Sequence, residues 1–180
     1  MRKTVLIMTM SLDGHVVAPD GMATGNSPEA AELKRWKLDR ISRAGAHLMG
    51  RVTYEGMASF WPKSKDEYAS PMNDIQKVVF SKSLEKADWP TTTIARGELA
   101  DEIATLKKQE GGELIVWGGA SFAQAMARNG LVDEYAIITR PIAYGGGKPL
   151  FHELSSALEL KLLGATIYDS GATLHLFEPK

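Results

Sequence analysis

Three short segments of the sequence combine glycine, hydroxyl and cationic residues directly behind apolar runs of strand length. Glycines let backbone amides come close to a ligand, and a helix that begins behind them directs about half a positive charge toward it. Arg51 and Lys82 would add charged donors that suit phosphate. Together the segments predict a dinucleotide site with an extra phosphate, and therefore NADP(H) rather than NAD(H). The segments are Met49-Gly50-Arg51 with Thr53, Ser81-Lys82-Ser83, and Trp117-Gly118-Gly119-Ala120-Ser121.

Each segment also has a purely structural interpretation. A Gly-Gly pair behind a strand is more often a turn than a ligand site, Arg51 alone would be a solvated surface residue, and residues 81–83 alone would be a loop. The hypothesis therefore depends on all three segments meeting at one edge of the fold.

The surrounding pattern predicts the elements that could bring the segments together. Strands joined by helical crossovers form a mostly parallel sheet with helices on both faces, and the carboxyl ends of such strands face one side. The last two apolar runs, around Asp169-Ser170-Gly171, predict an antiparallel C-terminal hairpin. We therefore expect one α/β domain over residues 1–180. Strands are predicted at 4–10, 46–49, 77–80, 91–95, 113–117, 134–139, 158–168 and 172–177, and helices at 27–43 (start signal Ser27-Pro28-Glu29), from 50, at 99–109 and at 121–128.

Composition excludes several classes of protein. The chain has 180 residues, 44% of them hydrophobic, and a formal net charge of −1 with both signs mixed along it. No basic face therefore indicates nucleic acid or an anionic membrane. The absence of cysteine excludes disulfides, thiolate metal sites and a cysteine nucleophile. The four histidines lack ligand spacing, so we expect no metal, and the short N-terminal apolar run indicates neither a signal peptide nor a membrane span. A cytoplasmic protein is expected.

The run Gly145-Gly146-Gly147-Lys148 has the look of a nucleoside-triphosphate loop. That motif needs Ser or Thr after the lysine for magnesium, and Pro149 stands there instead. We therefore assign no such site.

Six motifs along the chain resemble, in their type and order, the dihydrofolate-reductase-like superfamily. They resemble more closely its branch related to the reductase domain of the bifunctional riboflavin-biosynthesis deaminase/reductase. The resemblance covers nearly the whole chain, although a chain without cysteine lacks that enzyme's zinc deaminase domain. The motifs are Ser11-Leu12-Asp13-Gly14, Met49-Gly50-Arg51-Val52-Thr53-Tyr54-Glu55, Val79-Phe80-Ser81, Trp117-Gly118-Gly119, Leu131-Val132-Asp133-Glu134 and Gly145-Gly146-Gly147-Lys148-Pro149-Leu150-Phe151.

The resemblance implies a homodimer that binds NADPH across the strand ends and transfers a hydride to a pterin-like or aminopyrimidine-like heterocycle, or to a small imine or carbonyl. Such activity is similar to that of 5-amino-6-(5-phosphoribosylamino)uracil reductase and dihydrofolate reductase. It implies that the segment from Ser11 to Ala18 borders the nicotinamide and the substrate. It also implies that Gly50, Arg51 and Thr53 bind the adenosine side and the pyrophosphate of the cofactor. Ser81 and Lys82, beside Ser83, would lie near the adenine and its ribose phosphate. The residues that would surround the pyrophosphate follow Trp117 and are Gly118, Gly119, Ala120, Ser121 and Phe122.

Two carboxylates are candidates for proton delivery. Asp13 is the first, because the family pattern places it beside the ring site, although an Asp-Gly pair also makes an ordinary turn. Glu32 and Trp36 have the i,i+4 spacing that dihydrofolate reductases use to anchor a pterin. The alternative is a solvated Glu32 and a core Trp36.

Two other functions remain open at this stage. One is a non-catalytic NADP(H)-binding or sensor module, whose cofactor site would look the same in the sequence. The other is an interaction domain in which the glycines are only structural.

Overall fold

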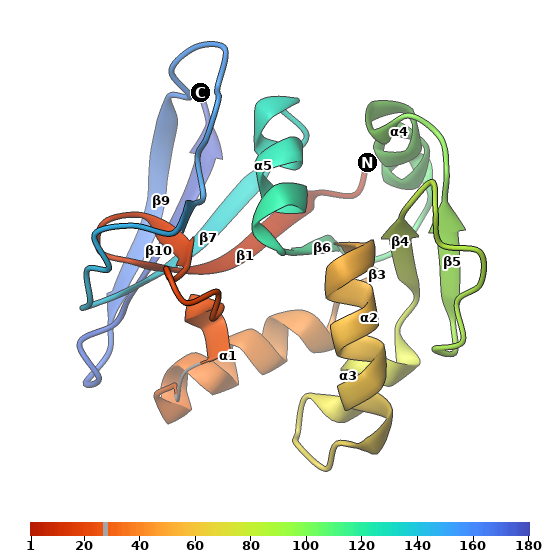
Figure 1. Ribbon diagram of the computed structural model, residues 1–180, viewed down its shortest axis with the longest axis horizontal. Coiled ribbons are helices and arrows are strands. Elements are labelled where there is room, and N and C mark those ends of the chain that lie inside the picture. Colours follow the sequence, from red (N-terminus) through yellow and green to blue (C-terminus); the bar gives the residue numbers. More distant parts are fainter. Residues whose placement is uncertain (27–28) are drawn as a thin grey trace.

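An eight-stranded sheet forms the centre of the computed structural model, which describes residues 1–26 and 29–180. The strands are β1 (Thr4–Ser11), β2 (His15–Val17), β3 (Ala46–Gly50), β4 (Lys77–Phe80), β5 (Thr92–Ala95), β6 (Leu114–Trp117), β7 (Glu134–Arg140), β8 (Lys148–Pro149), β9 (Leu160–Ile167) and β10 (Thr173–Pro179). Their order in the main sheet is β5-β4-β3-β6-β1-β7-β10-β9 (Figure 1). Every pair from β5 to β7 is parallel, whereas β10 is antiparallel to β7 and β9. The predicted α/β sheet with its C-terminal hairpin is confirmed.

The helices are α1 (Ala31–Ser42), α2 (Arg51–Phe60), α3 (Ala69–Asp74), α4 (Leu99–Lys108) and α5 (Ala120–Arg128), with short 3-10 turns η1 (Thr24–Asn26) and η2 (Trp61–Lys63). The first helix begins at Ala31, later than predicted, and the proposed start signal at residues 27–28 lies outside the described residues. The elements β2, β8 and α3 were not predicted because they are too short to show a period. No helix in the described ranges is long and apolar enough to cross a membrane.

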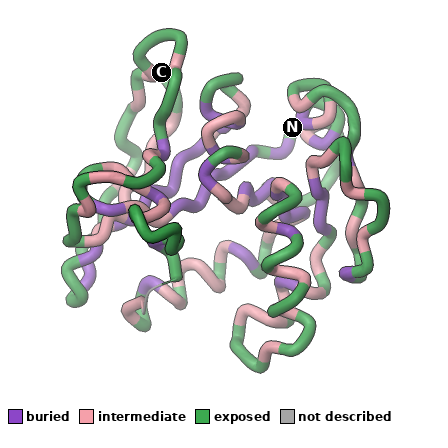
Figure 2. The backbone as a smooth tube through the Cα atoms, in the orientation of Figure 1, coloured by how far each residue is buried: buried purple, intermediate pink, exposed green. Residues whose placement is uncertain are grey.

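Helices cover both faces of the sheet, as predicted. Alternate residues of β1 point to opposite faces, so Leu6 packs with the buried side chains of α4 and α5, and Val5 packs with Leu33 of α1. A third cluster joins α1, α2 and α3 over β3 and β4. Figure 2 shows the buried trace running through the central strands, while the outer strand β9 is largely exposed. Each buried aliphatic side chain stabilises this arrangement by roughly 1.5–3 kcal/mol.

The loop behind β1 is fastened to the loop behind β7. The carboxylate of Asp13 accepts hydrogen bonds from the Gly145 and Tyr144 N–H groups at 2.7 and 3.1 Å. Just beyond, β2 pairs with β8. Gly147 has a φ of 116°, and a Cβ atom there would lie 2.1 Å from the Val17 carbonyl oxygen. Gly147, the last of the three glycines, therefore serves this close approach of backbones.

Candidate functional site

The three predicted phosphate-binding segments follow the ends of adjacent parallel strands. β3 lies between β4 and β6, with Gly50 opposite Phe80 and Met49 opposite Trp117. The chain therefore leaves all three strands at the same level. The predicted meeting of the segments at one edge is confirmed, and their role toward a cofactor remains a prediction.

Two helices begin directly at this edge, each behind a glycine. Gly50 precedes α2 and Gly119 precedes α5, and no side chain in the described part of the chain caps either helix. The first turns lie close together, because a Cβ atom at Gly119 would be 3.0 Å from Thr53 Oγ1. Since the first N–H groups of a helix have no partner within it, this edge presents two sets of donors at two positive helix ends.

Gly118 and Gly119 stand at this edge for different reasons. Neither has a positive φ, so backbone conformation does not require glycine at either position. A Cβ atom at Gly118 would lie 1.9 Å from Met8 Cε, whereas Gly119 is the residue before α5. A side chain at the first glycine would therefore displace the end of the Met8 side chain of β1, and the second glycine borders the uncapped helix end.

The two cations of the edge are exposed and paired with acids in this structure. Arg51 Nη1 donates to Glu55 Oε1 at 2.8 Å within α2, and Lys82 Nζ donates to Glu98 Oε1 at 2.7 Å. Exposed pairs of this kind are worth less than about 1 kcal/mol, so an anionic ligand can compete for either cation.

Apart from Ala18, which follows β2, the other predicted cofactor residues lie around the same edge. Ser81 Oγ accepts hydrogen bonds from the Ser83 and Leu84 N–H groups at 3.2 and 3.0 Å, which closes the turn behind β4. Phe122 packs against Phe80 with ring centroids 5.1 Å apart. Ser121 is exposed in the first turn of α5. Ala18 lies in a turn, where its N–H donates to the Met22 carbonyl oxygen at 2.9 Å.

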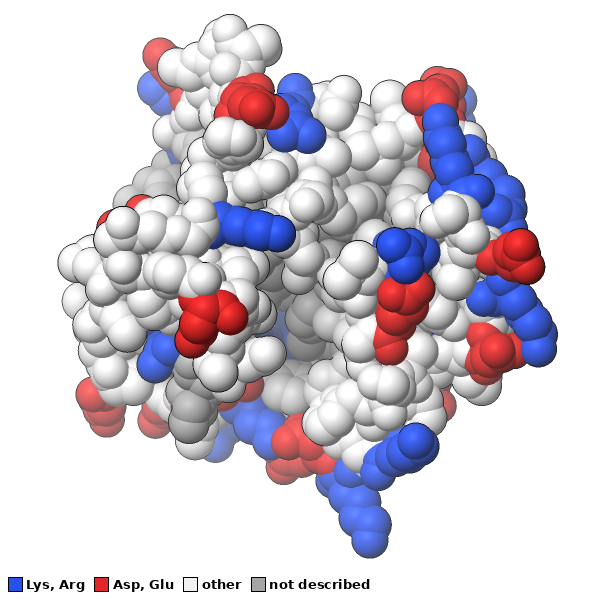
Figure 3. All heavy atoms as spheres, viewed as in Figure 1, with Lys and Arg blue, Asp and Glu red and all other residues white. Residues whose placement is uncertain are grey.

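A cleft of about 840 Å³ lies beside α2. Figure 3 shows this face of the molecule hollowed there. One side of the cleft, which we call the strand-end wall, consists of Thr53 and residues 117–120. Three polar side chains that the sequence did not single out also line it, and we call Glu29, Lys37 and Tyr68 the polar wall. Gly50, Arg51 and residues 81–83 lie outside the lining of the cleft.

The polar wall is a connected group. Glu29 Oε2 lies 2.7 Å from Lys37 Nζ, and Glu29 Oε1 accepts a hydrogen bond from the Tyr68 hydroxyl at 2.9 Å. Burial, together with the adjacent Glu29 charge, raises the pKa of Tyr68 far above its ordinary value, so the hydroxyl stays protonated. The wall therefore presents a carboxylate, an ammonium and a phenol, which can both accept and donate hydrogen bonds.

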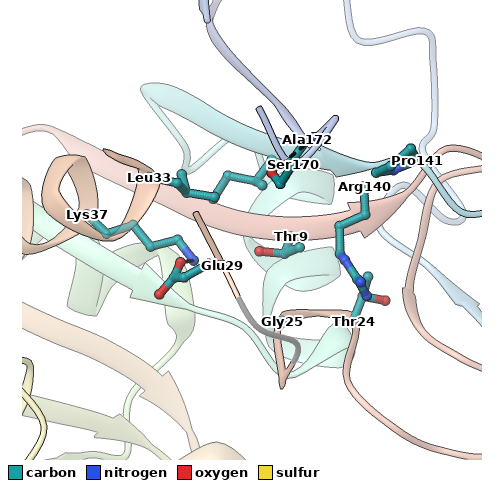
Figure 4. A pocket seen from close by; sticks show the side chains of 11 residues that line it. Thr9, Thr24, Gly25, Glu29, Leu33, Lys37, Arg140, Pro141, Ser170 and Ala172 are labelled. Carbon is teal, nitrogen blue, oxygen red and sulfur yellow. Dashed lines mark hydrogen bonds and ion pairs between the residues drawn. The ribbon is translucent and has the colours of Figure 1, made fainter. Parts of the chain in front are cut away.

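A smaller pocket of about 100 Å³ adjoins the cleft and shares Thr9, Glu29 and Lys37 with it. Figure 4 shows Lys37 and Glu29 facing each other on one side, Arg140 beside Thr24 on the other, and Thr9 between them. This end of the cleft is therefore more polar than the part that runs along α2.

Glu32 and Trp36 do not reach the cleft. Glu32 is exposed, and its charge, together with burial, raises the pKa of Tyr168 on the far side of α1. Trp36 packs against the core cluster that contains Val5, with the Arg40 guanidinium 5.8 Å from its ring. The i,i+4 spacing placed the pair on one helix face, but that face is turned away from the cleft. In this structure Glu32 is solvated and Trp36 packs against the core. The acidic residue that lines the cleft is Glu29.

Asp13 is held as an ion by its hydrogen bonds. The Ser11 hydroxyl and the Gly145 and Tyr144 N–H groups all donate to its carboxylate, and they hold its pKa well below the usual range. A carboxyl group in this state is a poor proton donor at neutral pH. The geometry favours a role in fastening the two loops.

A buried histidine holds one residue of the strand-end wall in place. Trp117 Nε1–H donates to His47 Nδ1 at 3.0 Å, and because indole is only a donor, the ring proton of His47 is on Nε2, 3.1 Å from the Pro71 carbonyl oxygen. Burial lowers the pKa of His47 to about 4. The partners come from β6 and α3, so neither could be read from the sequence around His47.

Comparisons with known proteins agree on fold and family. Residues 2–174 match the RibD C-terminal domain. The uncharacterized protein YwjB of Bacillus subtilis is 30% identical over 175 residues, which are 97% of each chain. A crystal structure from Shewanella sp. PV-4, named for riboflavin biosynthesis, has a TM-score of 0.81 at 24% identity and covers 99% of both chains. Enterococcus faecalis dihydrofolate reductase, solved with NADP(H), has a TM-score of 0.67 at 14% identity and covers 99% of this chain and 96% of that one. The protein has a dihydrofolate-reductase-like fold and belongs to the RibD C-terminal domain family.

Proposed function

We propose that this protein is an NADPH-dependent reductase that transfers a hydride to a small heterocycle of the pterin or aminopyrimidine type, or to a small imine or carbonyl compound. The observation that carries the proposal is the pair of uncapped helix ends, α2 and α5, beside one cleft. The family and the dinucleotide-bound dihydrofolate reductase of the same fold support it.

The strand-end wall and the edge behind it suit NADPH. The first N–H groups of α2 and α5 would hold the pyrophosphate, and residues 81–83 would lie on the adenosine side. Arg51 would leave its ion pair with Glu55 and bind the extra phosphate of the cofactor, because a dianion is the stronger partner for a guanidinium. When bound, NADPH would supply the hydride, and the protein would position the acceptor carbon.

The polar wall suits a heterocycle. The Glu29 carboxylate can accept a hydrogen bond from a ring N–H, while Lys37 and Tyr68 can donate to a ring carbonyl. Glu29, paired with Lys37, is therefore our candidate for orienting the substrate, in place of Glu32 and Trp36.

We also propose that the protein forms a homodimer through β9. Among the described strands, β9 pairs only with β10, and its Leu162, Leu163 and Ile167 side chains are 54%, 44% and 82% exposed. An apolar edge strand of this kind tends to pair with another strand. Sedimentation should find a dimer that Ile167→Lys converts to a monomer. A monomeric wild-type protein would contradict this proposal.

Titration with NADPH and NADH tests the reductase proposal directly. We expect NADPH to bind more tightly than NADH and to be oxidised in the presence of at least one compound from a panel of pterins, aminopyrimidines and small carbonyls. If neither nucleotide binds below roughly 1 mM, the reductase proposal fails. NADPH binding without oxidation by any compound of the panel would instead favour a non-catalytic NADP(H)-binding module.

A further inference from the structure

The middle of helix α2 contains a glycine, Gly56, that the fold does not explain. Glycine disfavours helices because it gives up more backbone freedom than alanine when it is ordered. A glycine in such a place lowers helix stability by about 1 kcal/mol relative to alanine, so what matters is whether a side chain there would disturb a contact.

No requirement within the protein is visible at Gly56. Its φ is not positive, and among the described residues no atom lies within 4 Å of the place where a Cβ atom would stand. At Gly118, by contrast, a Cβ atom would overlap the end of the Met8 side chain. Gly164 is also open, but it lies beside the register shift between β9 and β10. Gly56 therefore differs from both.

Gly56 faces the cleft between two exposed apolar side chains. Val52 lies one turn before it and Phe60 one turn after it, they are 73% and 56% exposed, and all three residues line the cleft. Met57 and Trp61 add further apolar lining. The missing side chain therefore makes a shallow notch in an apolar helix surface, with helix backbone at its base.

We propose that Gly56 is a specificity-determining residue, and that a flat, conjugated ring of the substrate lies against the α2 backbone in this notch. The inference rests on the proposed reductase function and names the substrate class. A flat ring matches a notch between aliphatic and aromatic side chains, and its polar edge could reach the polar wall in the same cleft. Cofactor phosphate would lie about one turn closer to the start of α2, near Thr53.

The test is Gly56→Ala, which adds one methyl group in open space. The matched control is Gly164→Ala, the same change at another open glycine, which does not line the cleft. Affinities for pterin, lumazine and 5,6-diaminouracil are measured by calorimetry with and without saturating NADP⁺, together with NADPH affinity and melting temperature.

We expect Gly56→Ala to weaken binding of at least one ring by tenfold or more, with NADPH affinity within twofold of wild type and a melting temperature at or above it. Gly164→Ala should leave both affinities unchanged. Ring binding unchanged in Gly56→Ala, or no ring binding to the wild-type protein, would overturn the inference. A lower melting temperature would make the glycine structural, and a selective loss of NADPH would assign the notch to the cofactor, so either would also overturn it. If NADPH does not bind the wild-type protein, the reductase proposal fails. The role of Gly56 is then still decided by the affinities for the three rings measured without nucleotide.

Discussion

The two walls of the cleft differ in how their residues are brought together. The strand-end wall comes from segments that directly follow parallel strands, and adjacent strands must end on the same side of the sheet. The polar wall joins Glu29, before α1, to Lys37 within α1 and Tyr68 before α3. Its assembly depends on the rotation of a helix and on a loop. Sequence order predicts the first kind of wall well and the second kind poorly.

The strongest test of this contrast replaces, one at a time, the two acidic residues near α1 by glutamine. Glu29→Gln should lower the rate of hydride transfer by about 100-fold, as misplacing a substrate does, while NADPH affinity stays unchanged. Glu32→Gln is the matched control, because Glu32 is exposed outside the cleft. Single-turnover oxidation of NADPH measures both variants. A rate loss in Glu32→Gln, with none in Glu29→Gln, would contradict this assignment and support the pair Glu32 and Trp36 that the sequence predicts.

Acid should weaken the strand-end wall through His47. Its pKa in the folded protein is about 4, below the ordinary value of 6.5, so the unfolded chain binds the proton more readily. The contribution of His47 to the free energy of unfolding is constant above pH 6.5. As the pH drops from 6.5 to about 4, the free energy of unfolding falls by up to about 3 kcal/mol. Urea unfolding followed by tryptophan fluorescence at several pH values measures this slope.

The control for that slope is His47→Gln, which cannot titrate. Its unfolding free energy should depend less on pH over the same interval than that of the wild-type protein. Identical slopes would show that the acid sensitivity arises elsewhere.

Packing at the strand-end wall should respond to a single methyl group. Gly118→Ala should lower the free energy of unfolding by about 1–3 kcal/mol, because the new Cβ would overlap Met8. The double variant Met8→Ala/Gly118→Ala should be less unstable than the sum of the single effects. Strict additivity, measured by urea unfolding, would contradict the packing explanation of this glycine.

The smallest effect is expected at the exposed edge behind the wall. Arg51→Ala should weaken NADPH binding about tenfold, equivalent to about 1.4 kcal/mol, with a smaller loss for NADH. Glu55→Ala is the matched control, since it removes the partner of Arg51 and leaves the guanidinium in place. Equal losses for the two nucleotides in Arg51→Ala would show that Arg51 does not bind the extra phosphate.

The sequence predicted the sheet, its parallel order and the C-terminal hairpin, because these follow from apolar runs of strand length and from rules of connection. It did not reveal the contact at Gly118, where an added Cβ would meet Met8, a residue more than a hundred positions earlier. The link from His47 to Trp117 was equally hidden, because it crosses between strands. At Asp13 the residue was identified, but its partners lie in a distant loop that no local pattern reveals.

The place of β1 in the sheet has a consequence for biosynthesis. Both neighbours of β1 are distant in the chain, β6 at Leu114–Trp117 and β7 at Glu134–Arg140. A growing polypeptide therefore carries an apolar strand with two unpaired edges until most of its length has been translated. Such an exposed strand is the kind of segment that aggregates or recruits chaperones. β1 supplies Ile7, Met8 and Thr9 to the lining of the cleft, so this part of the cleft is completed only after β7 has been made.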